Sequence, residues 1–471
     1  MSGWRGELQL EGRRALLLGL GSRQGGLGVA RYLVEQGARV RVTDQRAEHE
    51  LRESLAALRD LPIEYTLGRH EDADIRWADV IVRNPAVPRE SEWLLLARDL
   101  DKPIEMEMTL FFRACQGAIA GVTGTKGKTT VTTLLAAMLR QGRPHAVLAG
   151  NMGVSALSQL NAISRGTPVA IELSSFQLEG LDERRMSPPV AVLTNLSPDH
   201  LDRYPSFGEY ARTKAAIFAH QRPNDWAIVE DGALPESIEG TIAGRRATFG
   251  TRRSPDAGHA LWVENGRFCG RWDGAPVDLG PAAGLRVPGE HSRLNALAAA
   301  AAALAMGATA GDIQRAIAGF GGVPHRLERV AMIAGVEYVN DTAATAPAAA
   351  IAALRAFAGR EIVAIAGGSE KKLSLEPLAG ALVASASAVV LLEGGATPAL
   401  ERLLRERGHR SIAGPFGSME AAVARASELA RPGALVLLSP GTASFGMFRD
   451  EFHRGEAFRA AVGALERACA T

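Results

Sequence analysis

The chain has 471 residues, which predicts two to four domains, and its 46% hydrophobic and 22% charged residues argue against extensive disorder. Its 53 Lys and Arg against 52 Asp and Glu leave a formal charge of +1 with no basic run, which argues against nucleic-acid binding. Cys115, Cys269 and Cys469 are too far apart for a disulfide framework or a zinc site and favour a reducing compartment. The amino terminus lacks the apolar core of a signal peptide, and the longest apolar run, residues 296–306, is too short to span a bilayer, so we expect a cytoplasmic protein.

Short apolar runs alternate with longer helical patterns along almost the whole chain, which predicts an α/β fold with parallel sheets. Expected strands cover residues 15–21, 39–43, 80–82, 119–122, 169–172, 190–194, 362–366, 389–392 and 435–438. Residues 226–287 differ, because their short alternating pieces rich in Gly, Pro and Arg predict an insertion or an antiparallel extension. Residues 294–306 predict an Ala-rich helix.

A first Gly-rich turn, GLGSRQGGLG, occupies residues 19–28. It misses the dinucleotide-binding pattern because three residues rather than two separate Gly21 from Gly25. A strand that ends before a helix N-terminus still offers backbone N–H groups and partial positive charge to a phosphate. Asp44, at the end of the next strand, is placed to accept from a ribose or a base. Nucleotide binding, an NAD oxidoreductase and a plain strand-to-helix turn all remain open here.

A second loop, GVTGTKGKTT at residues 121–130, follows an apolar strand and opens a helix. A strict Walker A motif would need glycine at Val122, so the general pattern fails by one residue. The remaining glycines let backbone N–H groups approach phosphates, Lys128 reaches the β and γ oxygens, and Thr129 can ligate Mg²⁺. The loop therefore predicts a triphosphate site.

Three further residues are candidates only in the light of that loop. Glu172 ends an apolar strand, where a second metal ligand would lie, although a lone acid there is usually just solvated. His200 lies in a polar loop after another apolar strand and by itself reads as a solvated or capping histidine. Lys214 lies at helical spacing and by itself reads as a surface lysine.

Eight strings make the chain resemble the Mur ligases over nearly its whole length. In chain order they are GVTGTKGKTT, AGNMG, IELSSFQLE, TNLSPDHLDRY, YARTKAAIF, PGEHSRLNALAAAA, GVPHRLE and VLLSPGTASF. The string IELSSFQLE in particular is similar to that of the members that join glutamate to UDP-N-acetylmuramoyl-L-alanine.

The resemblance implies a role for each matching residue. ATP would be held by Gly124, Thr125, Lys126, Gly127, Lys128, Thr129, Thr130, Asn295, Arg326 and Asp341. The UDP-linked substrate would contact Gly21, Gly25, Asp44 and Asn151, and the incoming amino acid would contact Lys371 and Ser444. The catalytic group would be Lys128, Glu172, His200 and Lys214. Two Mg²⁺ ions would be held by Thr129, Glu172, His200 and a carbamylated Lys214.

The resemblance also implies an architecture and a reaction. A Rossmann-like domain over residues 1–108 would bind the UDP-linked substrate, a P-loop domain over 109–324 would bind ATP, and a Rossmann-like domain over 325–471 would bind the amino acid. ATP would phosphorylate a carboxylate to an acyl phosphate, which the amine then attacks. We expect a monomeric, ADP-forming ligase of peptidoglycan precursor synthesis.

Three departures from the family pattern bear on the amino acid. The first is the stretch NDTAATA, residues 340–346, which has Ala343 in place of a lysine and Ala346 in place of an asparagine. The second is Glu451, which stands at a position that is usually aromatic. The third is Lys126, which replaces a common asparagine. The changes in residues 340–346 and at Glu451 fall near the expected amino-acid pocket. We therefore favour the branch of the family that adds L-glutamate and works with a separate epimerase, with D-glutamate as the alternative.

Three different functions fit less of the sequence. Folylpolyglutamate synthase also activates a carboxylate with ATP, but its ATPase domain comes first in the chain. An NAD-dependent oxidoreductase leaves the second loop unexplained. A non-catalytic P-loop protein would need neither Glu172, His200 nor Lys214.

Overall fold

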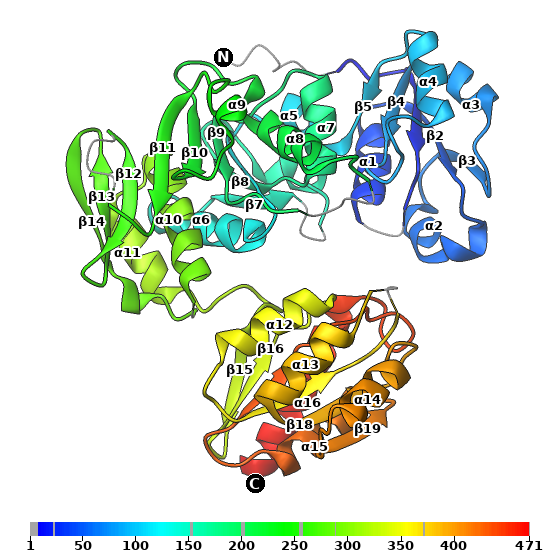
Figure 1. The fold of residues 1–471 in the computed structure, drawn as a ribbon. Helices are drawn as coiled ribbons and strands as arrows, with labels where there is room; N and C mark the ends of the chain where they lie inside the picture. Colours follow the sequence, from blue (N-terminus) through cyan, green and yellow to red (C-terminus); the bar gives the residue numbers. More distant parts are fainter. Residues whose placement is uncertain are drawn as a thin grey trace. The chain divides into compact units, whose positions relative to one another are not determined.

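The computed structural model describes residues 8–21, 24–150, 154–198, 203–253, 258–287, 289–370 and 373–470. The chain divides into two units, one formed by Met1–Leu285 with Glu290–Phe320 and the other by Arg286–Gly289 with Gly321–Thr471. The first unit contains two sheets and the second unit contains one (Figure 1).

The first sheet is built from five parallel strands in the order β3-β2-β1-β4-β5. The strands are β1 (Arg14–Leu18), β2 (Arg39–Asp44), β3 (Ile63–Leu67), β4 (Val80–Arg83) and β5 (Ile104–Glu105). The helices are α1 (Gln24–Glu35), α2 (Arg52–Leu58), α3 (Asp72–Trp77), α4 (Glu92–Asp99) and α5 (Glu107–Ala114), with a 3₁₀ helix at Glu48–Glu50. The central strand β1 has consecutive leucines buried on both faces, as expected where helices cover both sides of a parallel sheet.

The second sheet has nine strands in the order β14-β13-β12-β11-β10-β9-β6-β8-β7. They are β6 (Ala118–Thr123), β7 (Val147–Gly150), β8 (Pro168–Glu172), β9 (Val190–Leu193), β10 (Trp226–Glu230), β11 (Arg245–Gly250), β12 (Ala260–Glu264), β13 (Arg267–Trp272) and β14 (Ala275–Pro281). Neighbouring strands are parallel from β7 through β8, β6, β9, β10 and β11 to β12. Only the pairs β12–β13 and β13–β14 are antiparallel. The antiparallel extension expected over 226–287 is therefore confirmed only from β12 onward.

Six helices belong to the second sheet. They are α6 (Lys128–Gly142), α7 (Ser175–Glu183), α8 (Phe207–Ala219), α9 (Glu236–Glu239), α10 (Glu290–Ala305) and α11 (Ala310–Gly319), with 3₁₀ helices at Leu157–Ala162 and Ala282–Gly284. The alanines of α10 are buried, and their small side chains let α10 pack closely on α6. The Ala-rich helix expected over 294–306 is confirmed and begins four residues earlier.

The second unit is a doubly wound sheet in the order β15-β16-β20-β17-β18-β19, in which only β15 is antiparallel. Its strands are β15 (Glu328–Ile333), β16 (Val336–Asn340), β17 (Ile362–Ala366), β18 (Ala386–Leu392), β19 (Ile412–Phe416) and β20 (Leu435–Leu438). Its helices are α12 (Pro347–Ala356), α13 (Glu376–Ser385), α14 (Thr397–Glu406), α15 (Met419–Leu429) and α16 (Glu451–Ala470). Residues of α12 to α14 pack in one apolar cluster and residues of α15 and α16 in another, on opposite faces of the sheet.

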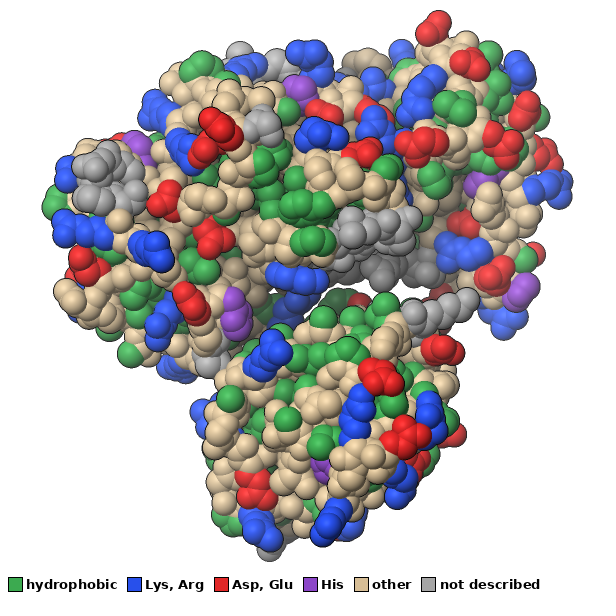
Figure 2. Space-filling model, viewed as in Figure 1, with side chains coloured by type: hydrophobic (Ala, Val, Ile, Leu, Met, Phe, Trp, Pro, Cys, Tyr) green, Lys and Arg blue, Asp and Glu red, His purple; other side chains and the backbone are tan. Residues whose placement is uncertain are grey.

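These observations confirm an α/β fold with parallel sheets. Within the described ranges, no helix is long and apolar enough to cross a membrane. On the face drawn in Figure 2, Lys and Arg are interspersed with Asp and Glu over the described residues, in keeping with the near-zero net charge.

Candidate functional site

The loop between β6 and α6 has the backbone of a phosphate-binding turn. Gly124 has φ +147° and Gly127 has φ +81°, both in a region that favours glycine. A Cβ atom at Gly124 would lie 1.9 Å from Thr194 Oγ1, and one at Gly127 would lie 2.3 Å from Asn295 Oδ1. Neither position can therefore carry a side chain, and the loop runs directly into the N-terminus of α6, which attracts anions.

Lys128, the first residue of α6, lies over this loop. Its Nζ donates to the carbonyl oxygens of Gly124 at 2.9 Å and Thr125 at 3.1 Å. Thr129 and Thr130 follow on the first turn of α6, half-buried, whereas the Lys126 side chain is exposed. The ammonium of Lys128 is thus held at the place where a bound phosphate would meet the loop.

The segment after β9 clamps the loop from the neighbouring strand. The Asn195 carbonyl oxygen accepts from Thr125 N at 3.0 Å, and Asn195 Oδ1 accepts from Lys126 N at 3.0 Å. Thr194 Oγ1 donates to the Lys126 carbonyl at 2.6 Å, and Ser197 N donates to Thr125 Oγ1 at 3.0 Å. Sequence reasoning assigned Thr194 and Asn195 no role, because the local sequence does not show that β9 lies beside the loop strand β6.

Glu172 lies at the carboxyl end of β8, where it is 3% exposed. Its backbone pairs with Val122 in the strand that leads into the loop, which explains why position 122 is a buried strand residue here. Lys214 is 2% exposed on α8, which packs against β9 and β6, and its Nζ lies 4.9 Å from the centre of the Tyr210 ring. The lone-residue interpretation of Lys214 as a surface lysine is therefore wrong.

Only part of the expected group of metal ligands lies within the described residues. His200 lies outside the described residues, whereas Thr129, Glu172 and Lys214 lie within them. Within the described ranges, no three His, Cys, Asp or Glu side chains gather closely enough to hold a metal ion.

Three of the expected UDP-substrate residues, Gly21, Gly25 and Asp44, lie at the carboxyl edge of the first sheet. Gly21 N donates to Asp44 Oδ2 at 3.0 Å, and Arg46 N donates to Asp44 Oδ1 at 2.9 Å. Burial raises the pKa of the Asp44 carboxyl, but these hydrogen bonds and the Arg46 guanidinium outweigh it and hold the pKa below its usual value. Gly25 lies on the first turn of α1, where a Cβ would lie 3.0 Å from Glu107 Oε2.

Glu107 was missed by sequence reasoning. Its Oε1 accepts from Ser155 Oγ at 2.5 Å and from Ala156 N at 2.9 Å, so it joins α5 to the segment that follows Asn151. Asn151 itself lies outside the described residues. No sequence pattern singles out Glu107 from the neighbouring acids.

In the second unit, Asp341 follows β16 at the carboxyl edge of the sheet. Its Oδ1 accepts from Leu327 N at 3.2 Å, and its Oδ2 accepts from Ser439 Oγ at 2.7 Å. Burial raises the pKa of the Asp341 carboxyl to about 7, against the lowering effect of these bonds and of Arg326. The Arg326 side chain is exposed.

Ser444 follows β20 at the same edge and is 4% exposed. Lys371 lies outside the described residues. The neighbouring loops are pinned by the buried guanidinium of Arg454, which donates to the carbonyl oxygens of Thr342, Thr442 and Ala443. Burial lowers the pKa of Arg454 to about 10.

Phe452, the residue after Glu451, bears on the loss of the usual aromatic side chain at position 451. Phe452 is 46% exposed, and its ring centre lies 5.7 Å from that of His325. Glu451 begins α16, and its carbonyl accepts from Thr342 Oγ1 at 2.9 Å. An aromatic side chain is therefore available at this end of α16, one position later than in the family pattern.

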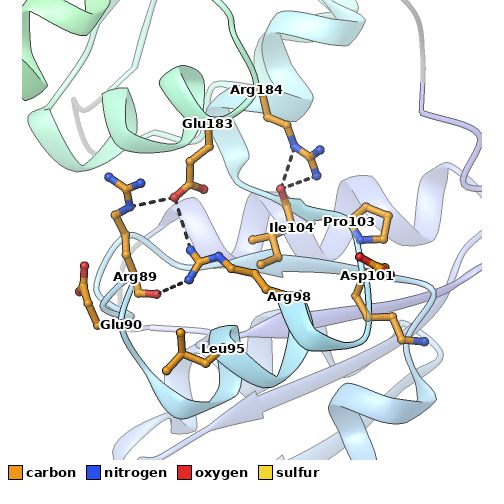
Figure 3. A pocket seen from close by; sticks show the side chains of 10 residues that line it. Arg89, Glu90, Leu95, Arg98, Asp101, Pro103, Ile104, Glu183 and Arg184 are labelled. Atoms are coloured by element: carbon orange, nitrogen blue, oxygen red, sulfur yellow. Dashed lines mark hydrogen bonds and ion pairs between the residues drawn. The ribbon is translucent and has the colours of Figure 1, made fainter.

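A hollow of about 730 Å³ lies elsewhere in the first unit, between α4, β5 and the end of α7 (Figure 3). Glu183 forms ion pairs with Arg89 at 2.8 Å and Arg98 at 3.5 Å, and Arg184 donates to the Ile104 carbonyl at 2.7 Å. The Glu183 carboxylate is thus paired with the guanidinium groups of Arg89 and Arg98. None of the expected site residues lines the hollow. We interpret the hollow as a gap left where the first sheet and α4 pack against the end of α7, and not as a ligand site.

Three family models match the chain in succession. They are described as the Mur ligase MurD-like N-terminal domain at residues 13–105, the Mur ligase middle domain at 122–303, and the Mur ligase glutamate ligase domain at 325–441. The first and second matches each cover one of the two sheets of the first unit.

Curated relatives match over almost their whole lengths. A protein of Roseiflexus sp. (strain RS-1), named UDP-N-acetylmuramoylalanine--D-glutamate ligase, is 49% identical over 97% of this chain and 99% of its own. A protein of Geobacter metallireducens with the same name is 37% identical over 97% of this chain and 99% of its own.

Solved structures share the fold. UDP-N-acetylmuramate-alanine ligase from Thermotoga maritima matches with a TM-score of 0.58 and 20% identity over 96% of this chain and all of its own. The MurF ligase of the same organism, solved in complex with ADP, matches with a TM-score of 0.54 and 19% identity over 98% of this chain and all of its own.

Proposed function

The chain belongs to the Mur ligase family and is an ATP-dependent amide ligase, and from this premise we propose that it joins D-glutamate to UDP-N-acetylmuramoyl-L-alanine. The observation that carries the ligase chemistry is the loop at 124–127 with Glu172 paired to the strand that leads into it, and the names of the relatives support D-glutamate. A loop of this kind binds a triphosphate, and an acid at the end of the adjacent strand serves a phosphoryl-transfer site.

We assign activation of the substrate carboxylate to this loop. A carboxylate does not react with an amine in water, because hydroxide is a poor leaving group. Transfer of the γ-phosphoryl group creates an acyl phosphate, and the Lys128 ammonium neutralises charge that develops on the transferring group. The amine of glutamate then attacks the acyl carbon, and phosphate leaves.

The described residues fit a divalent cation that prefers oxygen ligands. The Glu172 carboxylate and the Thr129 hydroxyl would supply two such ligands, and Lys214 would supply a third once its amine is carbamylated. The buried position of Lys214 on α8, beside β6 and β9, suits that modification better than a solvent-facing lysine would. Bound Mg²⁺ would offset the negative charge of the phosphates during transfer.

We assign the UDP-linked substrate to the carboxyl edge of the first sheet and the amino acid to the second unit. An anionic Asp44 suits hydrogen-bond donors of a nucleoside, and the Gly21 to Gly25 turn suits its diphosphate. The loops after β16 and β20, which include Ser444, suit glutamate, and Asp341 suits the ribose of ATP.

D-glutamate replaces the enantiomer that the sequence favoured. The preference for L-glutamate rested on Ala343, Ala346 and Glu451, and the relatives named for the D-glutamate reaction do not support it. The exposed ring of Phe452 offsets the loss of an aromatic residue at position 451. The partner epimerase expected for L-glutamate then has no place in the proposal.

A folylpolyglutamate synthase and an NAD oxidoreductase both explain less of the chain. A five-stranded sheet precedes the P-loop sheet, which argues against a folylpolyglutamate synthase. The three family matches leave no basis for an NAD oxidoreductase, because the MurD-like N-terminal model accounts for the first Gly-rich turn.

The deciding experiment measures phosphate release from ATP with UDP-N-acetylmuramoyl-L-alanine and each pure enantiomer of glutamate. We expect turnover with D-glutamate and at most traces with L-glutamate, and no release when either co-substrate is omitted. Release that does not depend on the UDP-linked substrate would contradict the ligase proposal, whereas faster turnover with L-glutamate would contradict only the choice of enantiomer.

A further inference from the structure

Glu179 lies on α7 and is 4% exposed, and its carboxylate is fully engaged. Oε2 accepts from Arg83 Nη2 at 3.3 Å and from Arg203 Nη2 at 3.2 Å. Oε1 accepts from the Tyr204 hydroxyl at 2.9 Å. One carboxylate therefore gathers an arginine from the first sheet and two residues from the segment after β9.

Both arginines also hold the same loop of the first sheet, residues 84–87. Arg83 Nη1 donates to the Val87 carbonyl at 3.0 Å, and Arg203 Nη1 donates to the Pro85 carbonyl at 3.2 Å. The loop follows β4 and lies against the Gly-rich turn, because a Cβ at Gly19 would lie 3.0 Å from Asn84 Cβ. Glu179 thus acts on the edge of the first sheet to which we assign the UDP-linked substrate.

Contacts continue from Glu179 to the ATP loop. The Tyr204 ring stacks on Phe176 with centres 6.3 Å apart and lies 5.4 Å from the Tyr210 ring. The Tyr210 hydroxyl donates to Thr125 Oγ1 at 3.3 Å. An unbroken series of contacts therefore joins residues 84–87 to the P-loop.

We infer that Glu179 is a positioning residue that holds the substrate-binding edge of the first sheet at a fixed distance from the P-loop. This inference rests on the proposed function, because only a substrate that contacts both places depends on that distance. ATP and glutamate do not span it. Loss of the Glu179 charge should therefore weaken binding of the UDP-linked substrate selectively.

The chemistry of the cluster supports this role. Arg83 is wholly buried, and burial lowers its pKa while the nearby carboxylates raise it, so the guanidinium depends on its acidic partners. Without the Glu179 charge, two guanidinium groups would face each other without a shared anion. The arginines would then separate and release residues 84–87.

Glu183 supplies a matched control on the same helix. It also forms ion pairs with two arginines, Arg89 before α4 and Arg98 on α4, but its side chain is 23% exposed and neither arginine holds residues 84–87 (Figure 3). Exposed ion pairs of this kind contribute little. Glu183 also acts on Arg83 through its charge, but it forms none of the hydrogen bonds of the Glu179 cluster. Glu183→Gln therefore removes one acid and two ion pairs from α7 and leaves the hydrogen bonds of Arg83 and Arg203 to Glu179 and to residues 84–87 in place.

The test compares the wild-type chain, Glu179→Gln and Glu183→Gln. Steady-state kinetics give KM for each substrate, and calorimetry gives Kd for UDP-N-acetylmuramoyl-L-alanine without ATP. For Glu179→Gln we expect KM and Kd for that substrate to rise at least tenfold, with KM for ATP and glutamate within twofold. Glu183→Gln should match the wild type. If Glu179→Gln does not fold, Arg203→Lys takes its place, because it keeps the charge but replaces the two nitrogens that donate separately to Pro85 and Glu179 with a single ammonium.

Two results would overturn the inference. One is an unchanged KM for the UDP-linked substrate in a folded variant, and the other is a parallel rise for all three substrates. An inactive wild-type chain would instead refute the proposed function, so the two failures are distinguishable.

Discussion

The strongest pH prediction concerns Asp341. Burial raises the pKa of its carboxyl from the ordinary value of 3.8 to about 7, so the folded chain binds this proton more tightly than the unfolded chain. Stability from this group is fully present below pH 3.8 and is lost as the pH rises through about 7. The shift corresponds to about 4 kcal/mol of folding free energy as an upper bound, at about 1.4 kcal/mol for each tenfold change in proton affinity.

Asp341→Asn is the appropriate perturbation. The amide has the same size, its oxygen can accept from Leu327 N, and its nitrogen can donate to Ser439 Oγ, while nothing titrates. The stability of the wild type minus that of the variant should fall by about 4 kcal/mol or somewhat less between about pH 4 and about pH 7.5. Taking the difference removes the pH dependence of all other groups.

The assay must report on the second unit. Every tryptophan precedes residue 273, so tryptophan fluorescence reports on the first unit only. Hydrogen exchange of the β20 and β16 amides, followed by mass spectrometry in urea and corrected for intrinsic exchange, measures the unit directly. If the wild type and the variant change in parallel across this range, the Asp341 carboxyl is not neutral in the folded chain and the reasoning fails.

Two further predictions concern the P-loop domain. Lys128→Ala should reduce kcat/KM about 100-fold or more, a loss of about 3 kcal/mol in transition-state stabilisation, while the exposed Lys126→Ala loses less than about tenfold. Comparable phosphate release from both variants would refute the role of Lys128. Lys214→Ala should be almost inactive and partly restored by acetate or formate, whereas Lys214→Arg fills the space and should gain nothing from either acid. Full activity of Lys214→Ala without added acid would show that catalysis does not depend on a carbamylated lysine at this position.

The sequence predicted most of the strands whose residues are buried on both faces, but it missed β7 and β16, which are also mostly buried. The strands ending at Leu18, Glu172 and Leu438 were found because continuous apolar runs are typical of covered parallel strands. Strands β3 and β19 were missed, because many of their residues are exposed or only half-buried and β19 contains Gly414 and Pro415. Apolar periodicity carries no information about such edge strands.

The residues of the site also fall into those that a local sequence pattern predicts and those that depend on tertiary packing. Gly124, Gly127 and Lys128 were predicted because a phosphate loop is local and its residues are contiguous. The clamp by Asn195 could not be read from spacing, because it depends on β9 lying beside β6, a neighbour about 70 residues away in the chain. The burial of Lys214 likewise follows from packing of α8 on the sheet and has no local signature.

Two strand-end carboxylates show how the fold sets chemistry at equivalent places. Asp44 and Asp341 each lie where a parallel strand ends at the carboxyl edge of a sheet, and both are mostly buried. Asp44 accepts two backbone N–H groups and lies beside the Arg46 guanidinium, which together keep its pKa low and leave the carboxylate an acceptor. Asp341 accepts one backbone N–H and one hydroxyl, which do not offset its burial, so near neutral pH it can also donate. The same residue type at two comparable strand ends therefore differs in protonation near neutral pH, because Asp44 has two backbone N–H groups and the Arg46 guanidinium beside it, whereas burial prevails at Asp341.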